Sequence, residues 1–130
     1  MANVLVVDND PTTVSLLRIL IELDGHKVSV CNSARKVLGE IERFGPDLVL
    51  MDVYLTSGDD GLDLLRRVRA YPPTSSLPVV MTSGMELSDE CARAGANGFL
   101  LKPYTPEQLT KTMKEILDHR TDASASAGKS

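Results

Sequence analysis

Four short apolar runs, each closed by a polar residue, constrain the fold of this chain more than any other feature. The runs are residues 4–7, 48–51, 79–81 and 99–101, and the polar residues that close them are Asp8, Asp52, Ser83 (one residue on, after Thr82) and Lys102. Continuous apolar runs, rather than alternating ones, are typical of strands buried in a parallel sheet. We therefore expect an α/β fold built around such a sheet.

Strand and helix patterns alternate five times along the chain. The expected strands cover about residues 3–8, 26–31, 47–52 and 98–101, and a further strand carries the apolar run 79–81, after which Ser83 stands. The second strand alternates polar and apolar residues, which indicates a less buried edge strand. Strands that alternate with helices imply a parallel sheet with helices on both of its faces.

Capping residues mark where several helices begin. Asp10 followed by Pro11 predicts a helix whose free amides are capped by Asp10, and Ser33 predicts a second cap. Thr105 and Gln108 form a capping box ahead of the last helix. From about residue 121 the chain has no large apolar residue, so residues 121–130 are expected to be a disordered tail or the start of a linker.

The composition fits one soluble globular domain. The chain has 130 residues, of which 42% are hydrophobic and 25% charged, with a net charge of -4. This charge argues against nucleic acid or an anionic membrane as the main partner. No apolar run approaches the length of a membrane span. The two cysteines share no motif spacing, which favours free thiols in a reducing cytoplasm.

The polar residues that close the apolar runs are expected to meet at one place. In an open α/β sheet, ligands bind in the crevice outside the carboxyl ends of the strands. Two carboxylates, a hydroxyl and an ammonium group would converge there. This set of groups can hold a divalent cation and a phosphoryl group, which makes Asp52 a candidate phosphate acceptor.

With these motifs in order, residues 3–119 resemble the receiver domain of two-component response regulators. The matching features are the acidic end of the first strand, Asp52, Ser83, the Lys102–Pro103 pair, and Phe99 three residues before that lysine. The resemblance implies a doubly wound, flavodoxin- and CheY-like sandwich with strand order 2-1-3-4-5. It places the receiver domain at residues 1–120.

The resemblance also implies a role for each matching residue. Asp52 would accept a phosphoryl group from a sensor histidine kinase or a phosphotransfer protein, with Lys102 and Ser83 bound to phosphoryl oxygens. Mg²⁺ would bind Asp8, Asp52 and the backbone carbonyl of Tyr54. Ser83 and Phe99 would form the switch, and Pro103 is a candidate for a cis peptide bond. The readout face would be the fourth helix, fifth strand and fifth helix, which could bind an output protein or a second copy of the chain.

The sequence departs from the family pattern in three places. Asn9 stands where the family has a second acid that binds the metal, which should weaken Mg²⁺ binding. Thr56 stands where the family usually has proline, and the loop up to Gly61 is one residue longer than usual. The stretch from Ser83 to Phe99 is about one helical turn shorter, which affects the fourth helix.

Other functions remain open at this point. Because Asn9 replaces a metal-binding acid, the chain could instead be a pseudo-receiver, in which the same fold serves only as a protein–protein docking module. A hydrolase with an aspartyl-phosphate intermediate would need a general acid or base, and no second acid follows Asp52 at the near spacing. A flavin carrier would need a phosphate-cradling loop after the first strand, where Asp8 and Asp10 would instead repel phosphate. The leading interpretation is a phosphorylated signalling module and not a true enzyme.

Overall fold

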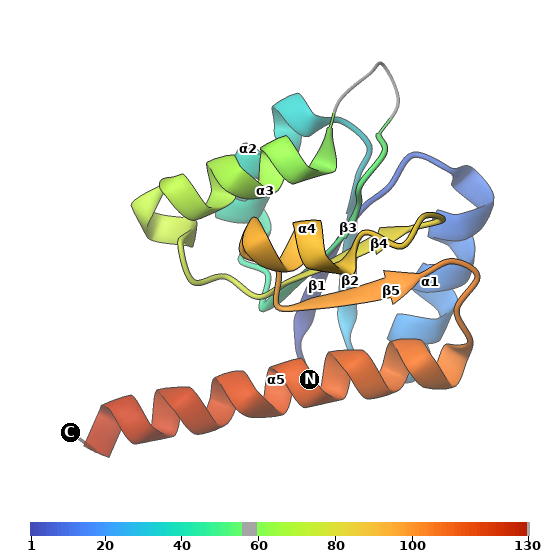
Figure 1. Ribbon diagram of the computed structural model, residues 1–130. Helices are drawn as coiled ribbons and strands as arrows, with labels where there is room; N and C mark the ends of the chain where they lie inside the picture. Colours follow the sequence, from blue (N-terminus) through green and yellow to red (C-terminus); the bar gives the residue numbers. More distant parts are fainter. Residues whose placement is uncertain (56–59, 130) are drawn as a thin grey trace.

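A computed structural model describes residues 1–55 and 60–129, and side chains as far as residue 119. The described residues form a five-stranded parallel sheet in the order β2-β1-β3-β4-β5 (Figure 1). The strands are β1 (Asn3–Val7), β2 (Lys27–Cys31), β3 (Leu48–Asp52), β4 (Val79–Ser83) and β5 (Gly98–Leu101). The predicted fold class, strand order and parallel pairing are confirmed.

Helices cover both faces of the sheet (Figure 1). They are α1 (Pro11–Leu23), α2 (Ala34–Phe44), α3 (Gly61–Ala70), α4 (Ser88–Arg93) and α5 (Pro106–Lys129), with a short 3₁₀ turn, η2 (Pro72–Thr74). Side chains of α2, α3 and α4 pack in one apolar cluster with residues of β1, β3 and β4. Side chains of α1 and α5 pack in a second cluster on the opposite face. The molecule is therefore a three-layer sandwich.

Burial explains why the central strands read as unbroken apolar runs. In β1, Leu5 and Val7 face the α2–α4 layer, whereas Val4 and Val6 face the α1–α5 layer, and all four are buried. Because both faces are covered, each position needs an apolar side chain. β2 lies at the sheet edge and is less buried, which matches its alternating sequence.

The predicted caps have different outcomes. The capping box of α5 is confirmed, because the Thr105 amide donates to Gln108 Oε1 at 2.8 Å and the Gln108 amide donates to Thr105 Oγ1 at 3.1 Å. Asp10 and Ser33 occupy the N-cap positions of α1 and α2, but neither side chain makes the predicted capping hydrogen bond. The Asp10 carboxylate instead accepts a hydrogen bond from the hydroxyl of Thr13 at 2.6 Å.

The last two helices differ greatly in length. α4 has only six residues, in line with the short stretch between Ser83 and Phe99. α5 continues to Lys129, through the segment for which the sequence predicts a disordered tail or a linker. Alanine at positions 123, 125 and 127 and the absence of proline favour helical continuation there.

Thr56 lies outside the described residues. Within the described part of the chain, no helix is both long and apolar enough to span a bilayer.

Candidate functional site

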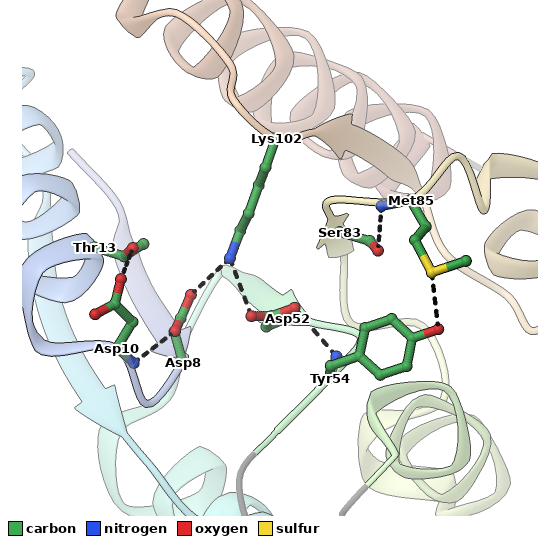
Figure 2. A network of polar contacts seen from close by, with 8 residues as sticks. All are labelled: Asp8, Asp10, Thr13, Asp52, Tyr54, Ser83, Met85 and Lys102. Atoms are coloured by element: carbon green, nitrogen blue, oxygen red, sulfur yellow. Dashed lines mark hydrogen bonds and ion pairs between the residues drawn. The ribbon is translucent and has the colours of Figure 1, made fainter.

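The polar residues that close the apolar runs meet at the carboxyl edge of the sheet (Figure 2). Asp8 directly follows β1, Asp52 ends β3, and Ser83 ends β4. Lys102 directly follows β5, and its amide donates to the Ser83 carbonyl at 2.8 Å. The parallel register brings these strand ends side by side. The predicted convergence of two carboxylates, a hydroxyl and an ammonium group is therefore present.

The Lys102 ammonium joins the two carboxylates. Its Nζ lies 3.0 Å from Asp52 Oδ2 and 3.4 Å from Asp8 Oδ2. The side chain of Asp8 is 4% exposed and that of Asp52 is 13% exposed. Burial favours the neutral form of Lys102, but the hydrogen bond to Asp52 and the charges of Asp8 and Asp52 outweigh it, so the pKa of Lys102 is raised. The three ionised groups together carry one net negative charge.

Backbone amides fix the other oxygen of each carboxylate. The Asp10 amide donates to Asp8 Oδ1 at 2.9 Å, and the Tyr54 amide donates to Asp52 Oδ1 at 3.1 Å. Each aspartate is thus held by the amide two residues further along the chain and by Lys102. This arrangement orients both carboxylates toward one point at the sheet edge (Figure 2).

Asn9 and Asp10 have different places beside this point. Asn9, which stands between Asp8 and Asp10 in the sequence, is half-buried, and Asp10 is exposed. The Asp10 carboxylate points to Thr13, whose hydroxyl chiefly holds the pKa of Asp10 below its usual value (Figure 2). Asp10 therefore contributes its amide to Asp8 and its carboxylate to the start of α1.

The predicted switch residues lie on neighbouring strands. Ser83 is fully buried, and its Oγ accepts a hydrogen bond from the Met85 amide at 3.0 Å. Phe99 is half-buried, pairs in register with Met81, and packs against the α2–α4 layer. The Lys102–Pro103 peptide bond is cis, the isomer that the resemblance implies.

Gly61 is a site residue that the sequence analysis missed. Its amide donates to the Val53 carbonyl at 2.6 Å, which brings the start of α3 against the end of β3. A Cβ on Gly61 would lie 2.9 Å from Val53 Cα and even closer to the Asp52 carbonyl oxygen. The signal was present in the sequence, since Asp60 precedes Gly61 and caps α3 through a 2.9 Å bond from the Leu62 amide.

A second missed feature is the contact between Tyr54 and Met85. The Tyr54 hydroxyl lies 3.5 Å from Met85 Sδ, and both residues are 57% exposed. Tyr54 comes two residues after Asp52, and Met85 comes two residues after Ser83. The two side chains therefore meet at the mouth of the site (Figure 2).

The donor set fits a magnesium ion that keeps most of its waters. Among the residues that the structure describes, no three His, Cys, Asp or Glu side chains cluster closely enough to form a metal site alone. Asp8 and Asp52 do converge, however, and Mg²⁺ commonly binds through one or two carboxylates together with substrate oxygens. A cation would also balance the excess negative charge of the site.

Comparison with known proteins points to one family. A family model described as "Response regulator receiver domain" matches residues 4–114. An uncharacterised 14.6 kDa protein of Leptolyngbya boryana is 34% identical over 116 residues, which cover 87% of this chain and 88% of that protein. A putative response regulator from Chloroflexus aurantiacus has a crystal structure with a TM-score of 0.84 and 34% identity, covering 90% of this chain and 98% of the other.

Other similar proteins differ in length or in sequence. The chain is 31% identical to the DNA-binding response regulator MtrA of Mycolicibacterium smegmatis, and the match covers 94% of this chain but 53% of that protein. The receiver domain of the sensor histidine kinase PA1611 of Pseudomonas aeruginosa shares the fold, with a TM-score of 0.80 and 22% identity over 90% of this chain and 98% of that one. That domain was crystallised with a magnesium ion coordinated in its active site cleft.

Proposed function

Because this chain belongs to the response regulator receiver family of two-component signalling, we propose that a histidine kinase or a phosphotransfer protein phosphorylates it on Asp52. The observation that carries this proposal is the ammonium of Lys102 between Asp52 and Asp8. It supplies a positive charge beside the partly buried carboxylate of Asp52, where a transferred phosphoryl group needs charge compensation. Receiver domains are generally not enzymes, and we assign this chain the role of a phosphoacceptor with slow self-dephosphorylation.

The transfer step follows from the positions of the side chains. A carboxylate oxygen of Asp52 attacks phosphorus in line, a P–O bond forms, and the bond from phosphorus to the donor's histidine nitrogen breaks. The ammonium of Lys102, now bonded to Asp52 Oδ2, pairs with a phosphoryl oxygen. The Tyr54 amide keeps Asp52 Oδ1 in place during the step.

Magnesium completes the proposed site. Asp8, Asp52 and the backbone carbonyl of Tyr54 would hold it, with Asn9 as a weak additional ligand. When bound, the ion neutralises charge on the transferring group. Asn9 provides an amide oxygen where the family has a carboxylate, so we expect weaker Mg²⁺ binding than in receivers that carry the second acid.

Phosphorylation would be read out through Ser83 and Phe99. The Ser83 hydroxyl accepts a hydrogen bond from the Met85 amide, and its own O–H would donate to a phosphoryl oxygen as Ser83 moves toward it. A movement of Ser83 would make room for the half-buried Phe99 on the adjacent strand. This two-state packing would change the face formed by α4, β5 and α5, to which an output protein or a second copy of the chain binds.

An apolar surface on α1 suits the phosphoryl donor. Leu16 and Ile19 are more than half exposed, and Leu16 also lines a groove of about 400 Å³ that reaches Lys102 and Tyr104. Because Lys102 lines the groove and its ammonium lies 3.0 Å from Asp52, a donor that packs on α1 would have its histidine near Asp52. Leu16→Glu should slow transfer from the kinase but leave labelling by acetyl phosphate unchanged, and equal slowing of both would contradict this docking surface.

The pseudo-receiver remains the second candidate, because Asn9 replaces an expected metal ligand. Intact mass spectrometry separates the two functions. The chain is incubated with acetyl phosphate, with and without Mg²⁺, beside an Asp52→Asn control. One Mg²⁺-dependent phosphate that the control lacks supports the receiver. No adduct at any Mg²⁺ concentration supports a docking module that acts without phosphorylation.

A further inference from the structure

The Tyr54–Met85 contact connects the two segments that follow β3 and β4, the strands that end in Asp52 and Ser83. The Tyr54 side chain comes from the segment after β3, and the Met85 side chain comes from the segment after β4. The backbone amide of Tyr54 binds the Asp52 carboxylate, and the backbone amide of Met85 binds the Ser83 hydroxyl. A change in the contact between the two side chains therefore acts on residues that directly hold the acceptor and the hydroxyl (Figure 2).

Met85 differs from the other methionines in its exposure. Its side chain is at the surface, whereas Met51, Met81 and Met113 are at most 3% exposed. Met1 is the other exposed methionine, and it does not lie at the site. Because oxidants reach exposed sulfur first, Met85 is the internal methionine at which oxidation is expected.

We propose that peroxide oxidises Met85 reversibly to the sulfoxide and that this modification slows phosphorylation of Asp52. In the reaction the sulfur lone pair attacks one oxygen of hydrogen peroxide, an S–O bond forms and the O–O bond breaks. Sulfur loses two electrons, the proton of the attacked oxygen passes to the second peroxide oxygen, and that oxygen leaves as water. The effect on phosphorylation rests on the proposed function, but the oxidation itself does not.

The physical reason for slower phosphorylation lies in the strength of the contact. A thioether is a weak hydrogen-bond acceptor, whereas a sulfoxide carries a polar oxygen. The Tyr54 hydroxyl would donate to that oxygen more strongly than it does to Met85 Sδ. The two loops would then be tied together at the mouth of the site, and both donor entry and Ser83 movement would be hindered. We expect labelling of Asp52 to slow by about three- to tenfold.

The first experiment maps the oxidation without reference to phosphorylation. The intact chain is treated with hydrogen peroxide, and peptide mass spectrometry follows the sulfoxide at each methionine over time. Met85 should oxidise well before Met51, Met81 and Met113. Tyr54→Phe should make Met85 oxidise faster, because its sulfur loses the hydroxyl contact. Equal oxidation of Met85 and the buried methionines would overturn the assignment of this site.

The second experiment measures acetyl phosphate labelling before and after peroxide treatment, with each variant compared with its own untreated form. Met85→Leu is the matched control, because leucine has a similar volume and both cysteines and the other methionines remain. Its labelling rate should not respond to peroxide, whereas the unsubstituted chain should slow and recover after methionine sulfoxide reductase. Equal slowing in Met85→Leu, or no slowing once Met85 is oxidised, refutes the regulatory part. Failure of the untreated chain to be labelled refutes the proposed function instead, and the oxidation map still decides the modification site.

Discussion

Replacing Gly61 with alanine tests how closely the start of α3 must approach β3, the strand that ends in Asp52. The added Cβ would lie 2.9 Å from Val53 Cα and 3.0 Å from the Val53 carbonyl oxygen, and closer still to that of Asp52. Favourable carbon–carbon separations are about 3.5–4.0 Å. All three neighbours are backbone atoms, so no side chain can rotate away. The backbone of Asp52 and Val53 must therefore move by about half an ångström or more.

The expected cost follows from this forced movement. Overpacking of this kind costs about 1–3 kcal/mol, and alanine recovers at most about 1 kcal/mol of helix propensity. We expect a net loss of about 1–2 kcal/mol in the free energy of unfolding and a melting temperature lower by about 3–10 °C. Labelling of Asp52 should also slow, because its carbonyl belongs to the displaced segment.

A second glycine provides the matched control. Gly39 lies in the middle of α2, is exposed, and has no atom within 4 Å of the position of a Cβ. Gly39→Ala should therefore stabilise the chain by up to about 1 kcal/mol and leave labelling unchanged. Thermal unfolding followed by circular dichroism, together with intact-mass labelling, measures both effects. If Gly61→Ala melts no lower than the unsubstituted chain and is labelled at the same rate, the close-approach argument is wrong.

Three further predictions follow from the polar contacts. The pKa of Lys102 is raised above 10.5, so its stabilising effect is complete below that pH and is lost as the pH rises through the folded value; urea unfolding at pH 9 and 11 should show a smaller loss of stability in Lys102→Met than in the unsubstituted chain, and an equal loss contradicts this assignment. Thr105→Ala removes one bond of the capping box and should cost about 1 kcal/mol in urea unfolding, with no loss if the cap is unimportant. Asn9→Asp adds a carboxylate beside Asp8 and should lower the Mg²⁺ concentration needed for half-maximal labelling of Asp52, a result that an unchanged or higher concentration would contradict.

Much of the fold was predictable from the apolar runs, because a strand covered on both faces has little freedom in its residue types. The same runs predict the meeting of Asp8, Asp52, Ser83 and Lys102, since parallel strands bring their carboxyl ends to one edge. The predicted side-chain cap by Asp10 was wrong, because a nearby hydroxyl can replace a backbone amide as the donor to the carboxylate. In α1 the hydroxyl of Thr13 does so.

Contacts that depend on the path of a loop could not be predicted from the sequence. The Tyr54–Met85 contact joins two segments that are 31 residues apart, and neither residue type indicates the other. The closeness of Gly61 to Asp52 likewise depends on how the chain returns after β3. The sequence therefore predicted which side chains meet at the strand ends, where the backbone geometry is regular, better than it predicted contacts made by the segments that follow the strands.

The position of Lys102 changes what a magnesium affinity means for this chain. Its ammonium already acts as an internal counter-ion for the two aspartates. An incoming Mg²⁺ ion would compete with Lys102 for the carboxylate oxygens of Asp8 and Asp52, so its measured affinity would include the free energy of loosening these two ion pairs. Removing the lysine charge should therefore tighten magnesium binding even while it impairs phosphoryl transfer. The Lys102 ammonium would thus lower the affinity of the site for Mg²⁺ and raise the rate of phosphorylation.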